Sequence, residues 1–175
     1  CYDECMQMKF TWPDKSKFSK GAFEVVKKLR EKGFETYIAG GAVRDALLKR
    51  KILELDIATS ATPIQVKKLF AKTIPTGEKH GTITVVYPHL VSPLARGRKQ
   101  RGFEVTTFRA EGDYEGFRRP KTVRFITDAR KDAQRRDFTI NALFYDTETR
   151  QIIDFVDGIE DLRRQRIRLV GGSEN

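Results

Sequence analysis

Apolar residues recur along the chain with two different spacings, and these spacings predict its helices and strands. From Ala22 onward, four apolar residues fall at positions i, i+3, i+4 and i+7, which form one helical face, and Gly33 is a suitable helix end. We therefore predict a helix over residues 16–33. Further helices are predicted over residues 43–50, 62–71 and 132–145. Runs rich in Val, Ile, Thr and aromatic residues predict strands at residues 34–39, 55–58, 82–87, 103–108, 123–126, 151–155 and 166–170.

This alternation of strands and helices predicts an α/β mixed (α+β) fold, in which helices pack on a mixed sheet. The pair Thr62-Pro63 is typical of an N-cap followed by the first helical position. Two segments rich in Gly and Pro, residues 88–102 and 110–120, are predicted to be loops. No apolar run approaches the ~20 residues that cross a bilayer, so we expect no membrane partner.

The charge of the chain changes the picture, because 34 basic residues outnumber 24 acidic ones and give a net charge of +10. Between Arg96 and Arg136 the chain has 13 basic and 6 acidic residues. Such an excess favours a polyanionic partner such as nucleic acid, although a merely well-charged surface is the alternative. The only cysteines are Cys1 and Cys5, which excludes a disulfide framework and indicates a reducing, cytoplasmic location.

Two glycines stand between a predicted strand and a predicted helix, and they are the first candidate for chemistry. Backbone N–H groups at Gly40 and Gly41 can approach an anion closely, and the following helix adds its dipole. Arg44 lies within the first helical turn and can donate paired hydrogen bonds to the same phosphates. The alternative is an ordinary tight turn, in which Asp45 tethers an arginine.

Two carboxylates one residue apart are the second candidate. Glu54 and Asp56 occupy alternate positions of a predicted strand and should therefore project from the same face. Close like charges need a cation between them, and Mg²⁺ binds carboxylates together with substrate phosphates. An exposed strand face with two acidic residues is the alternative for this pattern alone.

A second basic segment, residues 135–143, is the third candidate. Here Arg136 could bind triphosphate oxygens. On the predicted helix Asp137 and Asn141 are separated by four residues, so they would share a face and could bind ribose hydroxyls. A charged helix start with an Asp–Arg ion pair is the alternative.

At these residues the chain resembles the class II tRNA nucleotidyltransferases, or CCA-adding enzymes. They belong to the polymerase-β-like superfamily together with bacterial poly(A) polymerases. The resemblance extends over about residues 19–172 and rests on ordered matches at residues 40–48, 54–63, 81–86, 104–109, 111–120, 135–143, 154–158 and 161–171.

The resemblance implies a nucleotidyltransferase head domain over residues 16–172, preceded by an N-terminal extension of residues 1–15. It implies template-independent, Mg²⁺-dependent transfer from CTP and ATP to the 3′ end of tRNA, with release of pyrophosphate. By position, Glu54 and Asp56 would be the catalytic metal ligands, and Glu104 a candidate third carboxylate. The nucleotide-binding residues would be Gly41, Arg44, Arg136, Asp137 and Asn141.

This chain departs from the family pattern in three places. The family usually has Asp where this chain has Glu54, and the longer side chain predicts weakened activity. The segment 88–102 is longer and more basic than the usual hairpin. The base-selecting Glu-Asp-x-x-Arg motif and the neck, body and tail domains are not found in these residues.

Two other functions stay open from the sequence. One is a poly(A) polymerase of the same superfamily, although residues 76–84 are more similar to the CCA-adding group. The other is an RNA-binding fragment that lacks activity, because Glu54 and the missing domains would impair the site. The oligomeric state is not predicted by any of these patterns.

Overall fold

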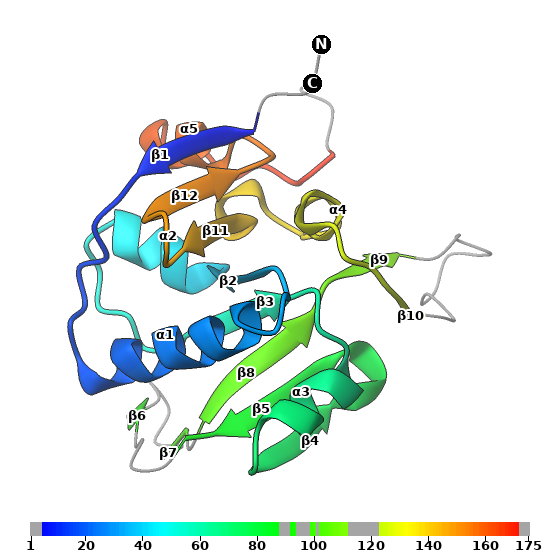
Figure 1. The fold of residues 1–175 in the computed structure, drawn as a ribbon. Helices are drawn as coiled ribbons and strands as arrows, with labels where there is room; N and C mark the ends of the chain where they lie inside the picture. Colours follow the sequence, from blue (N-terminus) through cyan, green and yellow to red (C-terminus); the bar gives the residue numbers. More distant parts are fainter. Residues whose placement is uncertain (1–4, 88–91, 94–98, 101, 112–122, 172–175) are drawn as a thin grey trace.

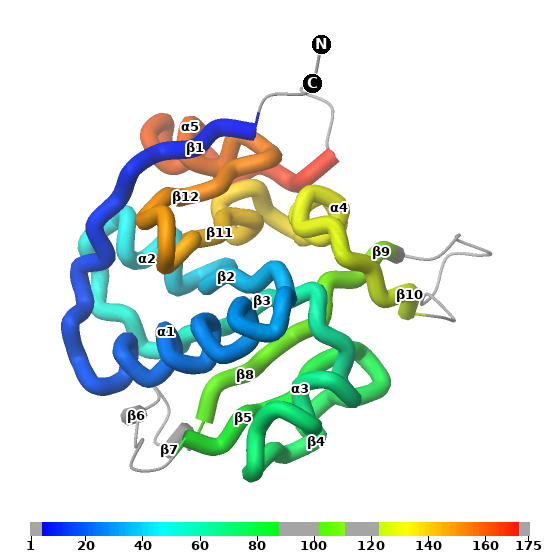
Figure 2. The backbone as a smooth tube through the Cα atoms, viewed as in Figure 1, coloured from blue at the N-terminus to red at the C-terminus, as the bar shows by residue number. Residues whose placement is uncertain are grey.

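The computed structural model describes residues 5–87, 92–93, 99–100, 102–111 and 123–171. Figure 1 shows the arrangement of its elements, and Figure 2 shows the course of the backbone. The helices are α1 (Lys17–Arg30), α2 (Gly41–Leu47), α3 (Pro63–Leu69), α4 (Ala129–Gln134) and α5 (Gly158–Arg163), with 3₁₀ turns η1 (Glu78–His80) and η2 (Thr139–Asn141). The strands are β1 (Met6–Lys9), β2 (Thr36–Ala39), β3 (Asp56–Thr59), β4 (Thr73–Gly77), β5 (Thr82–Val86), β6 (Ser92–Pro93), β7 (Lys99–Gln100), β8 (Gly102–Thr107), β9 (Arg109–Glu111), β10 (Val123–Phe125), β11 (Leu143–Asp146) and β12 (Gln151–Asp154).

Eight of the strands form one sheet, in the order β1-β12-β11-β2-β3-β8-β5-β4. Within this sheet β3 and β8 pair in parallel, and the other neighbours are antiparallel. Figure 1 shows β3 and β8 side by side near the middle of the molecule. The predicted mixed α/β fold with helices packed on a mixed sheet is therefore confirmed.

The two faces of the sheet are covered unequally. One face packs against α1, α2, α3 and α5 and forms the larger hydrophobic core, in which Leu29, Ile57 and Phe103 are fully buried. The opposite face has a smaller core, where Ala129 and Ala133 of α4 pack with residues such as Phe144. Because α4 covers only part of this second face, strand residues there remain available for a site.

Several predicted helices are confirmed together with their ends. Helix α1 begins after Ser16, whose hydroxyl accepts a hydrogen bond from the backbone of Ser19 at 3.3 Å. Gly33 follows this helix with φ = 82°, a conformation that suits glycine. Helix α3 begins after Thr62, which forms a reciprocal capping box with Gln65.

The single helix predicted over residues 132–145 is wrong. The chain there forms the end of α4, an irregular stretch, the turn η2 and then the buried strand β11. The backbone of Thr139 donates to Arg168 at 3.0 Å, and Asp137 accepts from Val170 at 3.1 Å. These bonds to a distant segment replace helical ones. An apolar run such as that of β11 cannot be distinguished from a buried helix by periodicity alone.

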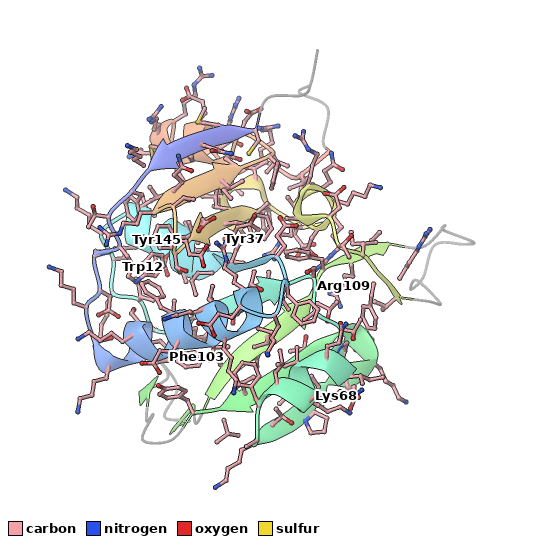
Figure 3. All side chains as sticks on the ribbon, viewed as in Figure 1. Trp12, Tyr37, Lys68, Phe103, Arg109 and Tyr145 are labelled. Atoms are coloured by element: carbon pink, nitrogen blue, oxygen red, sulfur yellow. The ribbon has the colours of Figure 1, made fainter. Side chains whose placement is uncertain are left out.

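The strand predicted at residues 166–170 is also wrong. Only an isolated bridge between Leu169 and Phe138 forms there, and the short helix α5 precedes it. In contrast, the sheet extends into the stretch assigned to an N-terminal extension, since β1 pairs with β12. Trp12 is buried, and its ring centroid lies 4.9 Å from that of Tyr145. Figure 3 labels both side chains.

The predicted loops at residues 88–102 and 110–120 lie largely outside the described residues. Within the first segment, the described residues form the short strand pair β6 and β7, so the loop prediction is wrong there. The pair β9 and β10 lies at the two ends of the second segment. In the described part of the chain, no helix has the length and apolar character needed to cross a bilayer.

Candidate active site

The glycine turn and the carboxylate strand are held together by the pairing of β2 with β3. In this antiparallel pair Ala39, the last residue of β2, lies opposite Asp56, the first residue of β3. Gly40 follows with φ = 72°, and its N–H donates to the carbonyl of Leu143 at 3.0 Å. The turn that opens α2 therefore begins directly beside Asp56.

The acidic residues project from the incompletely covered face of the sheet. Leu55 and Ile57 are fully buried in the larger core, whereas Glu54 and Asp56 are exposed. Asp56 lies on the pocket side of β3, whereas Glu54 precedes this strand, so the common side of the two acids stays a prediction from their spacing. Asp56 also lies opposite Glu104 in the parallel pairing of β3 with β8, so these two side chains share a face.

The crowding of these acids has an electrostatic consequence. Burial, together with the nearby carboxylates of Glu104 and Glu54, raises the pKa of Asp56 from its ordinary value to about 6, and the guanidinium of Arg136 opposes this rise. One side of Asp56 faces a pocket and is open to water, while protein surrounds its other sides. A cation at this position would relieve the repulsion.

The basic residues approach the same place from α4 and α2. Arg136 donates from Nη1 to the carbonyl of Asn141 at 3.3 Å, and its guanidinium lies over the ring of Phe144. Arg44 donates from Nη1 to the Oδ1 atom of Asn141 at 2.6 Å and from Nε to Asp45 at 2.9 Å. Asn141 thus connects the two arginines, and Asp45 tethers Arg44.

A pocket of roughly 390 Å³ collects most of these groups. Of the predicted site residues, it is lined by Asp56, Glu104, Arg136, Asp137 and Asn141. Asp137 is exposed and lies outside any helix, so the expectation that it shares a helical face with Asn141 is wrong. The two residues nevertheless reach the same pocket, because η2 turns the chain back toward it.

Three predicted residues stand beside this pocket without lining it, namely Gly41, Arg44 and Glu54. Arg44 is joined to the pocket through its hydrogen bond to Asn141. Glu54 is close enough to influence the pKa of Asp56.

Other pocket residues escaped the sequence reasoning. Arg109, Arg135 and Thr106 line the pocket. Asp132 lies behind it and forms ion pairs with Arg135 at 2.6 Å and with Arg136 at 2.9 Å. The i, i+3 and i, i+4 spacing of Asp132 from these arginines is the helical ion-pair spacing, and this signal could have found it.

The acidic side of the pocket has donors suited to a hard cation. Carboxylate oxygens are the preferred protein ligands of Mg²⁺, which also keeps waters and binds substrate phosphates. Among the described residues, however, no three His, Cys, Asp or Glu side chains form a complete metal-holding group. The protein would therefore supply part of the coordination, and a bound triphosphate would supply the rest.

The family model described as "Poly A polymerase head domain" matches residues 36–168. The chain belongs to this family. The match includes both strands that carry Asp56 and Glu104 and the segment from Asp132 to Asn141, so the whole pocket lies within the head domain.

The similar proteins are CCA-adding enzymes. The one from Lactobacillus johnsonii is 48% identical over 154 residues, which is 88% of this chain and 36% of the relative. The crystal structure of the Bacillus stearothermophilus enzyme in complex with CTP is 40% identical, with a TM-score of 0.72 over 89% of this chain and 34% of that chain. The Thermotoga maritima enzyme complexed with tRNA_CCA is 22% identical with a TM-score of 0.64, over 94% of this chain and 36% of that chain, and shows the shared fold alone.

These relatives are much longer than the chain described here, which spans about a third of their length. The expectation of a class II nucleotidyltransferase head is confirmed by the family match and these relatives.

Proposed function

We propose that this chain is the catalytic head of a tRNA nucleotidyltransferase of the CCA-adding type. It would transfer nucleotides from CTP and ATP to the 3′ end of tRNA and release pyrophosphate. One observation carries this proposal: a single pocket is lined by acidic residues of two adjacent strands and by the two arginines that directly follow α4. The relatives support this choice, because they are CCA-adding enzymes and one of them is in complex with CTP.

In this proposal the basic side of the pocket binds the triphosphate. Arg136 and Arg44 donate to phosphate oxygens, and both are already oriented by Asn141. The backbone of Gly41 lies beside Arg44 and adds a close approach for the phosphates. Asp137 and Asn141 accept and donate hydrogen bonds at the ribose hydroxyls.

The acidic side of the pocket holds the metal. Asp56 and Glu104, with Glu54 beside them, are the candidate ligands for Mg²⁺. When bound, the metal lowers the pKa of the attacking hydroxyl and stabilises the charge of the leaving pyrophosphate. The acidic side chains would hold the reacting groups at a fixed position relative to the arginines. Such positioning, together with electrostatic stabilisation, supplies most of the catalysis in phosphoryl transfer.

The reaction itself is a displacement at phosphorus. The terminal 3′-hydroxyl of the RNA loses its proton to water and its oxygen forms a bond to the α-phosphorus of the nucleotide. The bond from that phosphorus to the oxygen that bridges to the β-phosphate breaks, and pyrophosphate leaves. The arginines bind the negative charge that develops on the departing pyrophosphate. The pocket, which is open on one side, leaves room for the RNA end.

The remaining expectations stay proposals. A head domain over residues 16–172 continues into neck, body and tail domains in the family, and a cytoplasmic location is expected from the sparse cysteines. A poly(A) polymerase is not favoured, because the relatives reported above are CCA-adding enzymes.

The test is incubation of the chain with a tRNA that lacks its CCA end, Mg²⁺ and each labelled triphosphate separately. We expect CMP or AMP incorporation that disappears with EDTA and in an Asp56→Asn variant. An unrelated RNA of equal length is the matched control for substrate choice. Extension of that RNA, with no extension of the trimmed tRNA, would overturn the proposal in favour of the poly(A) polymerase.

A further inference from the structure

One buried carboxylate stands behind the arginines of the pocket. Asp132 is 1% exposed. Its Oδ1 atom accepts from Arg135 Nε at 2.8 Å, and its Oδ2 atom accepts from Arg136 Nη2 at 2.9 Å. Each oxygen therefore holds one guanidinium, and both guanidiniums belong to residues that line the pocket.

We propose that Asp132 is a positioning residue for triphosphate binding, acting through Arg135 and Arg136. This inference rests on the function proposed above and deepens it, because it names the group that orients the phosphate-binding side. Asp132 itself lies too deep to contact a ligand.

The geometry at the end of α4 explains why such a group is needed. The helix ends at Gln134, and the two consecutive arginines follow it. Adjacent side chains at a helix end point in different directions and repel each other when both are cationic. The common carboxylate draws Arg135 and Arg136 back to the same side and fixes their planar donor groups.

The charges also favour binding of an anion in front of the arginines. A single carboxylate holds two guanidiniums, so this group carries one net positive charge on the basic side of the pocket, while the acidic residues lie on its other side. Arg109 adds a further pocket cation, which Figure 3 labels at the start of β9. The negative charge lies behind the arginines, away from the open side, where it holds them without blocking a phosphate.

Asp132 connects a third pocket element as well. Its Oδ1 atom accepts from the backbone N–H of Arg109 at 3.2 Å, which ties the start of β9 to α4. One carboxylate thereby holds residues of two separate segments in place, namely the end of α4 and the start of β9. Among the described residues, the hydrogen-bond partners of this carboxylate are Arg109, Arg135 and Arg136, and all three line the pocket. A role in stability alone would not require this coincidence.

The matched control is another buried aspartate that holds an arginine. Asp146, at the end of β11, accepts from Arg30 at 3.0 Å, and its side chain is 11% exposed. Neither residue lines the pocket. Asp132→Asn and Asp146→Asn therefore both remove a buried charge from an Asp–Arg pair, and only the first affects the pocket arginines.

The experiment measures CTP affinity by calorimetry in the presence of Mg²⁺, at a temperature where each variant is folded by circular dichroism. We expect Asp132→Asn to weaken CTP binding by about tenfold or more, the effect of losing a charge-assisted contact. Asp146→Asn should leave the affinity within about twofold of the wild type. Asp132→Glu, which keeps the charge but moves it, replaces the first variant if that variant does not fold.

A measurement on the wild type alone complements the variants. The Nε–H resonances of Arg135 and Arg136 should be sharp and slowly exchanging before CTP is added, because Asp132 already holds them. Exchange-broadened resonances would overturn the inference. So would CTP binding by a folded Asp132 variant that equals the wild type, and in that case the proposed function would survive. If the wild type does not bind CTP, both proposals fail.

Discussion

The two faces of the sheet differ in what covers them, and this difference explains where the chemistry lies. Helices α1, α2, α3 and α5 cover one face and enclose the larger hydrophobic core, whereas α4 covers only part of the other face. The neighbours Leu55 and Asp56 demonstrate the contrast, since Leu55 is fully buried in the larger core and Asp56 opens to the pocket. One face stabilises the fold, and the other carries the acids and arginines of the candidate site.

The largest expected effect comes from changing the open face at Asp56. Asp56→Asn should lower the rate of nucleotide addition by about 10³-fold or more, because metal-assisted charge stabilisation contributes several kcal/mol. Single-turnover addition of CMP to trimmed tRNA measures this loss. The variant should remain folded, and activity within about tenfold of the wild type would contradict the contrast between the faces.

On the covered face, Leu29→Ala should produce the opposite result, because Leu29 is fully buried in the larger core and does not line the pocket. The substitution leaves a cavity in this core and should lower the free energy of unfolding by about 2–5 kcal/mol. Urea denaturation measures this change. For the fraction that remains folded at low temperature, nucleotide addition should stay near the wild-type rate. A stable Leu29→Ala protein with lost activity would show that the faces are not separable in this way.

A smaller gain is expected where this chain departs from its family on the open face. Glu54→Asp shortens the side chain by one methylene and should raise the rate of addition, by up to about 10²-fold if Glu54 is misplaced by about 1 Å. Comparison of Mg²⁺-dependent rates tests this, with Glu148→Asp, an exposed change near Arg30, as the control. An unchanged rate for Glu54→Asp would mean that the longer residue is not limiting.

The smallest expected effect concerns pH and stability. The pKa of Asp56 is raised to about 6 in the folded chain, so folding favours its protonated form. Between pH 4 and 7.5 the ionised side chain therefore destabilises the fold increasingly. Without metal, Asp56→Asn should be more stable than the wild type at pH 7.5, by about 1 kcal/mol or less after solvent screening. This gap should close at pH 4; a gap that is constant with pH would contradict the raised pKa.

Local sequence signals predicted the elements that position the acids. The spacing of Glu54 and Asp56 and the glycines after β2 are short-range features. The turn at Gly40 is confirmed, whereas the common side of the two acids stays a prediction. The cap at Thr62 was equally local. The family match confirms the fold that these signals indicate.

The sequence failed where distant segments decide the structure. Asp137 and Thr139 are not in a helix because their backbone groups form hydrogen bonds with residues 168 and 170. No local sequence pattern predicts such a long-range contact. The role of Asp132 likewise depends on Arg109, which is 23 residues away along the chain. The assignment of roles to Gly41, Arg44 and Glu54 stays a prediction, since they stand beside the pocket rather than in it.

The pairing of Ala39 with Asp56 has a consequence for how this protein can vary. The hydrogen bonds between β2 and β3 set the distance from the glycine turn to Asp56. The segment that connects α2 to β3 does not set this distance. An insertion at the exposed Lys51 should therefore leave both groups in place, whereas a shift of one residue in the ladder would turn Asp56 into the core. Tolerance to insertion should thus differ sharply within only a few positions of the chain.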